Sequence, residues 1–301
     1  MNRKSTTGHL SALLTIVIWG TTFISTKVLL VHFQAVEILF FRFLIGLLAL
    51  LIYPRRLTGT TYQQEFTFAA AGLCGVCLYY LLENVALTYT TAAHVGIIIS
   101  MAPFFTAILT HVFAKEKLQI HFFLGFIVAM LGIILIQLSN TKSEANFLGD
   151  LLALLASFAW SCYSLLTKTI STYGYHTLLT TRRTFFYGLL FMIPLLFLFD
   201  FKLDLFRFAN PTVLFNILYL GLGASALCFV TWNFSVKVLG AVRTSVYIYS
   251  VPIITVVTSF LFLHENITGR TITGTFLTLV GLFLSESKIW TGKVDTHGLP
   301  K

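Results

Sequence analysis

The sequence predicts an all-α integral membrane protein of ten transmembrane helices, arranged as an inverted repeat of five plus five. Two observations predict this fold class. First, 57% of the 301 residues are hydrophobic, only 10% are charged and the mean hydropathy is +0.87. That leaves too little polar surface to cover a soluble core of this size. Second, the latter half of the chain repeats the former.

The repeat is visible as matched residues at two fixed offsets. An offset of 141 residues places Trp19, Lys27 and Arg42 on Trp160, Lys168 and Arg183. An offset of 149 places Gly72, Asn84, Pro103, Glu116, Gly125 and Gly132 on Gly221, Asn233, Pro252, Glu265, Gly274 and Gly281. Because each half holds an odd number of predicted spans, the second copy enters the bilayer from the opposite side. This arrangement is typical of membrane transporters.

Each predicted span is an apolar run of about 20 residues, the length that crosses the hydrocarbon layer. The ten runs cover approximately residues 10–30, 34–53, 66–88, 92–113, 119–138, 147–168, 176–199, 211–236, 241–262 and 268–287. The connections are short, so no sizeable soluble domain fits between them. We expect a first five-helix repeat over 1–140, a second over 147–288 and a cytoplasmic tail over 289–301. The first run lacks a small-residue cleavage site, so we expect it to be retained as a span.

The net charge of +9 comes from Lys and Arg residues that lie between the apolar runs. They form no dense patch of the kind that follows a phosphate backbone, so we expect no nucleic-acid partner. With the N-terminus in the cytoplasm, twelve of these residues fall on inner segments and five on outer segments. The positive-inside rule then predicts a multi-pass protein of the cell membrane, surrounded by lipid, with both termini cytoplasmic. The sequence carries no signal for an oligomeric state.

Two opposite charges fall inside predicted spans, where an unpaired charge costs several kcal/mol. Arg42 and Glu83 lie at similar depth, which predicts that they pair directly or through water. Glu83 is also the first candidate for proton coupling; the alternative is a purely structural partner for Arg42. Arg182 and Arg183 lie toward the inner interface. Three roles remain open for them: they bind an anionic group of a substrate, they lie against the face of Trp232, or they extend to the membrane interface.

Aromatic and polar residues at matching depths in the two halves suit a cavity for a small amphipathic solute. The candidate cavity residues are Trp19, Thr22, Asn84, Ser100, Trp160, Tyr163, Asn233 and Tyr247. For the tryptophans and asparagines, helix packing is the open alternative.

Proline and glycine add two further expectations. Pro103 and Pro252 fall in mid-span, where each removes a helical hydrogen bond, so they are candidate gates or else static kinks. Gly125 with Gly132, and Gly274 with Gly281, are each seven apart and predict one face for close helix packing.

Several chemistries have no residues to carry them. The sequence contains no Walker P-loop, no ordered Ser-His-Asp set, no nearby pair of carboxylates and no metal-ligand spacing. We therefore expect no enzyme activity, no bound metal and no cofactor. The energy for any transport would come from a gradient or from exchange.

The ordered motifs resemble a known family. They are "IWGTTFISTK" in the first span, Arg42 in the second, "ENVALTYTTAAHVGIIISMAPFFTAILTHVF" across the third and fourth, and the following "KEKL". Over nearly its whole length the chain is similar to the EamA type of the drug/metabolite transporter superfamily. The resemblance implies that spans one, three, four, six, eight and nine surround a central cavity, with spans five and ten packed at one end. It places Trp19, Glu83, Asn84, Pro103, Trp160, Asn233 and Pro252 on cavity-forming or gating helices.

The resemblance implies a secondary active transporter that moves small-molecule metabolites by alternating access. We expect export of amino acids or related compounds. One alternative is an exchanger of phosphorylated or nucleotide-linked solutes, which requires basic residues such as Arg182 and Arg183 to face the cavity. An integral-membrane enzyme is the alternative from another class, and it would require acids or histidines clustered at one depth.

Overall fold

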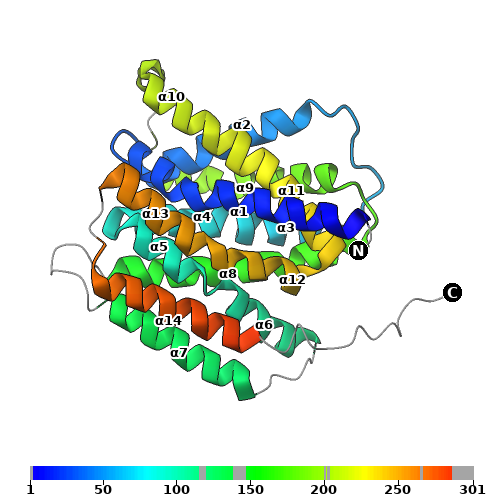
Figure 1. Cartoon of the computed structure of the whole chain (residues 1–301). Coiled ribbons are helices and arrows are strands. Elements are labelled where there is room, and N and C mark those ends of the chain that lie inside the picture. Colours follow the sequence, from blue (N-terminus) through cyan, green and yellow to red (C-terminus); the bar gives the residue numbers. More distant parts are fainter. Residues whose placement is uncertain are drawn as a thin grey trace.

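The computed structural model describes residues 3–114, 120–137, 147–199, 201, 204–264 and 267–286, and the regular structure of these residues is helical throughout (Figure 1). In the first half the helices are α1 (Arg3–Leu29), α2 (Ala35–Leu51), α3 (Tyr62–Gly72), α4 (Tyr79–Tyr89), α5 (Ala92–Ile99), α6 (Ala102–Ala114) and α7 (Ile120–Gln137). In the second half they are α8 (Phe147–Thr172), α9 (Thr177–Leu198), α10 (Pro211–Leu218), α11 (Cys228–Leu239), α12 (Ala241–Ser245), α13 (Val251–Leu263) and α14 (Gly269–Glu286). The predicted tail 289–301 and the repeated pair Glu116 and Glu265 lie outside the described residues.

Seven helical segments are long and apolar enough to cross a membrane. They are Ser5–Leu29, Tyr62–Tyr89, Ala92–Phe113, Phe147–Thr172, Thr177–Leu198, Pro211–Leu239 and Arg243–Leu263. At the other three predicted spans lie α2, α7 and α14, with 17, 18 and 18 residues. The multi-pass membrane class is therefore confirmed, and the count of ten crossings stays a prediction.

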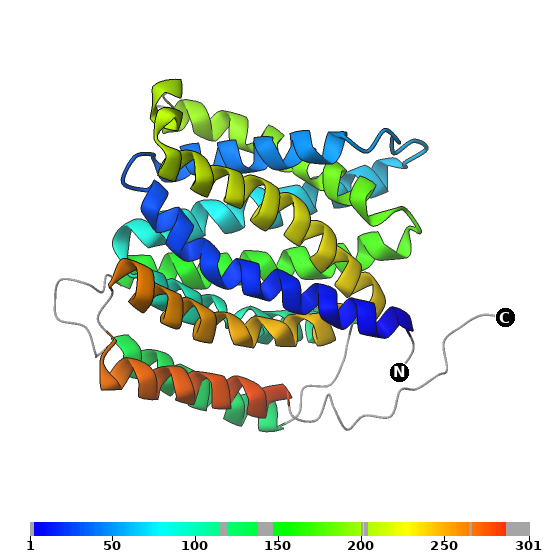
Figure 2. The same cartoon turned by 45° about the horizontal axis from the view of Figure 1, so that its top comes forward.

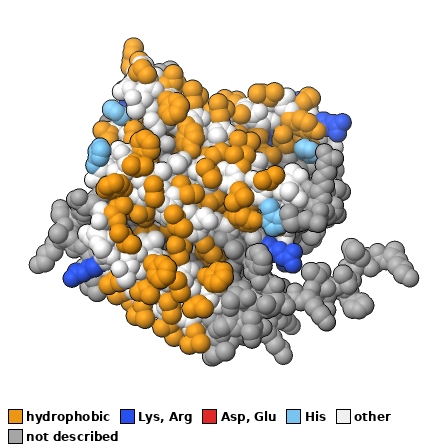
Figure 3. Space-filling model, in the orientation of Figure 1, with side chains coloured by type: hydrophobic (Ala, Val, Ile, Leu, Met, Phe, Trp, Pro, Cys, Tyr) orange, Lys and Arg blue, Asp and Glu red, His pale blue; other side chains and the backbone are white. Residues whose placement is uncertain are grey.

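The outer surface is apolar. Val17, Phe197, Phe260 and Phe276, on four different helices, each expose more than half of their side chains. On the face in Figure 3, hydrophobic side chains cover most of the described surface, and the Lys and Arg side chains lie toward its edges. A helical protein that exposes apolar side chains this widely is suited to lipid, because its backbone polar groups are already paired within the helices.

The first helices of the two halves run in opposite directions. At the end of α1, the Nζ of Lys27 donates to the Thr90 carbonyl over 2.6 Å, and Gly149, at the start of α8, packs against the same Thr90. At the start of α1, Gly8 packs against Leu239. Lys237, two residues before Leu239, donates to the carbonyl of Tyr175, just beyond the end of α8. The end of α1 therefore lies at the start of α8.

The last helices of the two halves, α7 and α14, form a pair along one edge of the molecule (Figures 1 and 2). A Cβ on Gly132 would lie 2.6 Å from the Gly274 carbonyl oxygen, and one on Gly281 would lie 2.5 Å from that of Gly125. The predicted glycine face is thus confirmed. Because Gly125 meets Gly281 while Gly132 meets Gly274, the two helices are antiparallel.

Both mid-span prolines follow a break in their helix. In the first half, α5 ends at Ile99 and α6 begins at Ala102, with Pro103 as its second residue. In the second half, a 3₁₀ segment (Val246–Ser250) leads into α13, where Pro252 is again the second residue. The helical hydrogen bonding is interrupted there because proline has no N–H to donate. The predicted interruption of these two helices is confirmed. A gating role for the prolines stays a prediction.

The helices before these breaks share a second irregularity. A π-helical segment, Leu73–Leu78, joins α3 to α4, and another, Tyr219–Leu227, joins α10 to α11. The offset of 149 residues carries the first segment into the second. Such π-helical turns are rare and often lie at functional sites, because the extra residue turns the following side chains to a new direction.

Candidate functional site

An aromatic cluster fills the centre of the molecule, where the two halves meet. The rings of Trp19 (α1) and Trp160 (α8) meet edge to face, with centroids 5.0 Å apart. Trp232 (α11) lies 5.1 Å from Trp19, and Tyr79 (α4) lies 4.9 Å from Trp160. All four side chains are buried. Trp19 and Trp160 occupy equivalent repeat positions, so equivalent residues of the two halves meet in this cluster.

A small cavity of about 20 Å³ lies against this cluster. Its lining residues are Trp19, Thr22, Phe23, Tyr79, Tyr80, Glu83, Ile99, Trp160, Ile248 and Val251. A space of this size holds about one water molecule, so the helices leave no room in it for a larger solute. Ile99 and Ile248 are repeat equivalents at the two helix breaks. The cavity is therefore bounded by matched residues from both halves and lies beside both broken helices.

Glu83 brings a carboxyl group to this cavity. Its side chain is 1% exposed, and it lies beside the Tyr79 hydroxyl and close enough to Arg42 for their charges to interact. Within the described part of the chain, Oε1 has no hydrogen-bond partner. A buried, incompletely bonded carboxylate is costly unless a proton or a cation joins it.

Arg42 lies behind one wall of the cavity. It is fully buried, its Nε donates to Ser225 Oγ over 3.1 Å, and its guanidinium carbon lies 4.1 Å from the centre of the Tyr80 ring. Among the described residues, neither Nη1 nor Nη2 finds a hydrogen-bond partner, and no ion pair within 4.0 Å joins Arg42 to Glu83. The site thus holds two opposite charges, each with unused hydrogen-bonding atoms.

Among the predicted cavity residues, Trp19, Thr22 and Trp160 line the cavity together with Glu83. Thr22 Oγ1 donates to the Trp19 carbonyl over 2.7 Å, and Trp19 Nε1 donates to the Ala224 carbonyl over 2.9 Å. The Trp160 Nε1 is buried without a partner in the described residues.

The other predicted cavity residues bond away from this cavity. Asn84 Nδ2 donates to the Ala35 carbonyl on α2, and Ser100 Oγ donates to the Ile97 carbonyl within its own break. The Tyr247 hydroxyl lies 2.6 Å from His9 Nδ1. Ile248, the residue after Tyr247, lines the cavity.

Tyr163 and Asn233 form a polar link of their own. The Tyr163 hydroxyl donates to Asn233 Oδ1 over 2.8 Å, and Asn233 Nδ2 donates to Thr181 Oγ1 over 3.0 Å. These bonds join α8, α11 and α9. Asn233 also borders a separate cavity of about 20 Å³ with Thr184. Tyr163 and Asn233 therefore act as cross-helix bonds beside the aromatic cluster.

Sequence reasoning missed several lining residues. These are Phe23, Tyr79, Tyr80, Ile99, Ile248 and Val251. Signals for four of them are present: Phe23 is four residues after Trp19, Tyr79 is four before Glu83, and Ile99 matches Ile248 at the repeat offset of 149. Residues four apart on a helix share a face, so helical spacing from Trp19 and Glu83 would have found the first two.

The arginines of the second half lie elsewhere. Arg183 makes a two-point contact with Glu65, in which Nε lies 2.9 Å from Oε2 and Nη2 lies 2.7 Å from Oε1. Arg183 of the second half is therefore paired with an acid of the first half. Arg182 donates to the carbonyls of Tyr53 and Arg55. Trp232, considered above as a face for these arginines, instead packs against Trp19 with the two rings tilted by 46°.

In the searched residues, no group of three or more His, Cys, Asp or Glu side chains is arranged to hold a metal ion. The four cysteines, Cys74, Cys77, Cys162 and Cys228, are free thiols.

Comparison with known proteins gives one family and several relatives. The model of the EamA-like transporter family matches residues 6–138 and again 147–286. An uncharacterized transporter of Archaeoglobus fulgidus is 29% identical over 96% of this chain and 99% of its own length. The uncharacterized transporter YdfC of Bacillus subtilis is 25% identical, over 96% and 94%.

Two further matches are a named exporter and a solved structure. A probable terminal-alkyne amino-acid exporter of Streptantibioticus cattleyicolor is 25% identical over 90% of each chain. A protein solved by crystallography superimposes with a TM-score of 0.66 at 16% identity, over 97% of this chain and 99% of that one. At this identity the structural match supports the fold alone.

Proposed function

Because the chain belongs to the EamA-like transporter family, we propose that it exports amino acids or closely related small metabolites by secondary active transport. Family and relatives make it a transporter rather than an enzyme, in a membrane and with a small-molecule substrate. The observation that carries the amino-acid proposal is the aromatic cavity flanked by Glu83 and Arg42, two buried groups of opposite charge.

An α-amino acid carries two charges that are complementary to those of Arg42 and Glu83. Its carboxylate matches the two unused Nη groups of Arg42, since guanidinium and carboxylate form paired hydrogen bonds. Its ammonium group matches Glu83, with the faces of Trp19 and Trp160 adding cation–π attraction. Tyr80 lies against the Arg42 guanidinium, so in this proposal its ring moves aside as substrate enters. The relative named as a probable amino-acid exporter supports the same substrate class.

We propose that residues 1–140 and 147–288 form an inverted repeat with ten crossings and both termini cytoplasmic. Such a repeat suits transport by alternating access. The opposed directions of α1 and α8, and of α7 and α14, support it. The cavity residues Ile99 and Ile248 lie at the two breaks before Pro103 and Pro252. In our proposal each break opens the cavity to one side, so these prolines belong to the two gates.

The small volume of the cavity fits an occluded step of such a cycle. About 20 Å³ is too small for any amino acid, so helices from the two halves must separate for substrate to bind. The alternative substrate class, phosphorylated or nucleotide-linked solutes, is less well supported, because Arg182 and Arg183 line a different pocket from the one between the tryptophans.

Transport by purified protein in liposomes tests the proposal. Vesicles would be loaded with unlabelled compound and assayed for uptake of labelled amino acids and of phosphorylated metabolites, with and without a pH gradient. We expect saturable exchange of at least one amino acid, competed by other amino acids. Saturable exchange of a phosphorylated solute alone would contradict the proposed substrate class while leaving the transporter assignment intact.

A further inference from the structure

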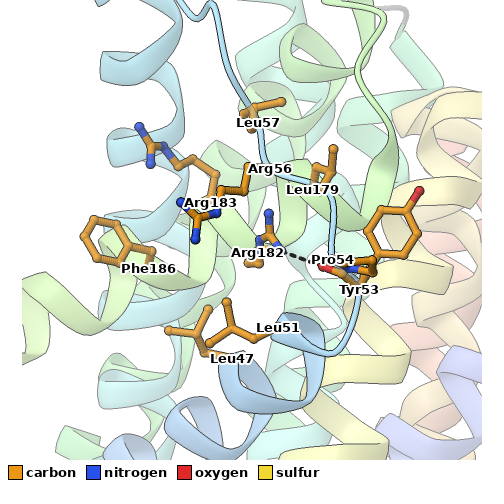
Figure 4. Close-up of a pocket in the computed structure, with 10 residues that line it drawn as sticks. All are labelled: Leu47, Leu51, Tyr53, Pro54, Arg56, Leu57, Leu179, Arg182, Arg183 and Phe186. Carbon is orange, nitrogen blue, oxygen red and sulfur yellow. Dashed lines mark hydrogen bonds between the residues drawn. The ribbon is translucent and has the colours of Figure 1, made fainter.

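A second and much larger pocket, of about 490 Å³, lies between the end of α2 and the first turns of α9 (Figure 4). Leu51, Leu179 and Phe186 contribute an apolar wall, and Arg56, Arg182 and Arg183 contribute guanidinium groups. In Figure 4 the three arginines lie near one another, and Leu47 and Leu51 form an apolar side below them. The pocket thus joins a cationic side to an apolar side.

The positive charge of this pocket is only partly neutralised. Glu65 pairs with Arg183. Arg182 donates to two backbone carbonyls, which carry no net charge, and no ion pair to Arg56 or Arg182 exists within the described residues. Two positive charges therefore remain for an anion. Arg183 lines the pocket as well, and its Nη1 makes no hydrogen bond among the described residues.

The pocket opens at the edge of the apolar surface. Leu51 is 52% exposed and Phe186 is 49% exposed, so the apolar wall continues onto the surface that faces lipid. Beyond Leu51 the chain leaves the helix and reaches Arg55 and Arg56, both exposed. An apolar wall that passes into arginines within a few residues matches the boundary between acyl chains and phosphate headgroups.

We propose that this pocket binds an anionic phospholipid, with its phosphate at Arg56 and Arg182 and the start of an acyl chain along Leu51 and Phe186. A soluble phosphate shares the anionic chemistry but has no use for the apolar wall that opens toward lipid. The site is distinct from the central cavity, with which it shares no lining residue. Because α2 and α9 belong to different halves, the bound lipid would also hold the halves together at this end.

The test is native mass spectrometry of the detergent-purified full chain with added phosphatidylglycerol or phosphatidylcholine. We expect phosphatidylglycerol to bind at least about tenfold more tightly, in line with the contribution of each basic residue near an anionic lipid. Arg56→Gln should weaken that binding several-fold and Arg56→Gln/Arg182→Gln by about tenfold or more, whereas Arg56→Lys/Arg182→Lys should retain it. Arg243→Gln, an exposed change on α12 outside the pocket, is the matched control and should have no effect.

Two results would overturn the proposal. One is equal binding of the two lipids by the wild-type protein, a measurement that does not depend on any variant folding. The other is displacement of phosphatidylglycerol by submillimolar inorganic phosphate or glycerol 3-phosphate, which would make this a site for soluble phosphates.

Discussion

Trp19 and Trp160 occupy equivalent positions in the two halves of the chain, and their rings meet edge to face at 5.0 Å beside the central cavity. The same cavity takes Ile99 and Ile248 from equivalent positions. Its charge, however, is not repeated: Glu83 has Trp232 at its equivalent position. The site therefore combines a symmetric apolar frame with an asymmetric pair of charges, which fits a carrier that opens to both sides and binds one orientation of a charged solute.

Replacing Glu83 tests whether this carboxyl group couples transport to protons. If Glu83 holds either a proton or the substrate ammonium group, Glu83→Gln should raise the KM for an amino acid by at least about tenfold, a loss of ~1.4 kcal/mol. Exchange should persist at high substrate concentration, but it should no longer respond to a pH gradient. The measurement is liposome exchange with and without the gradient. Unchanged gradient dependence in the variant would show that the proton is carried elsewhere.

Arg42 is predicted to bind the substrate carboxylate. Arg42→Gln should lower kcat/KM for an amino acid by at least about thirtyfold, since losing one member of a buried charge pair costs ~2 kcal/mol or more. Arg42→Lys should recover part of this, because a lysine keeps the charge without the paired geometry.

The double variant Arg42→Gln/Glu83→Gln tests whether the two side chains interact. If they do, the double variant should lose less than the sum of the single losses in free energy. Strictly additive losses would indicate that the two charges act independently.

The interface of α7 and α14 is predicted to tolerate no side-chain atom at its glycines. Gly281→Ala would place a Cβ 2.3 Å from Ala129 N, so the helices would have to separate, at a cost of ~1–3 kcal/mol. Thermal unfolding in detergent should show a lower Tm. Gly223→Ala is the matched control, because the nearest atom to its added Cβ is 3.6 Å away. Equal effects from the two substitutions would rule out close packing as the cause.

The two prolines are predicted to set the rate of helix movement rather than substrate affinity. Pro103→Ala and Pro252→Ala would each favour a continuous helix, because alanine supplies the missing N–H. We expect the maximal exchange rate to fall several-fold in both variants with little change in KM. Variants that keep the wild-type rate would identify the prolines as static kinks.

The repeat explains which features were predictable from the sequence. Gly132 and Gly281 could be assigned to a packing face because their spacing and their equivalence agree, and Pro103 and Pro252 could be assigned to breaks because proline acts on its own helix. Trp19 and Trp160 were found at the cavity for the same reason, since equivalent residues near mid-span meet where two halves join.

Contacts between distant elements were not predictable in this way. Glu65 precedes the predicted third span by a single residue, and nothing in the pattern indicates that it reaches Arg183 of the other half. The π-helical segment Leu73–Leu78 also precedes α4, whose Tyr79, Tyr80 and Glu83 line the cavity, and an irregular turn of this kind changes the direction of the side chains that follow it. Asn84 and Asn233 were expected at the cavity, but Asn84 donates to the Ala35 carbonyl and Asn233 donates to Thr181, and neither lines the central cavity.

The measurement that tests the central claim most directly is competition by charge-deleted analogues in the liposome assay. For a transported amino acid, the decarboxylated amine and the deaminated acid would be compared in the wild-type protein, Arg42→Gln and Glu83→Gln. The account predicts that the wild type rejects both analogues, that Arg42→Gln no longer distinguishes the amino acid from the amine, and that Glu83→Gln no longer distinguishes it from the acid. Equal discrimination in all three proteins would contradict recognition of a zwitterion by Arg42 and Glu83.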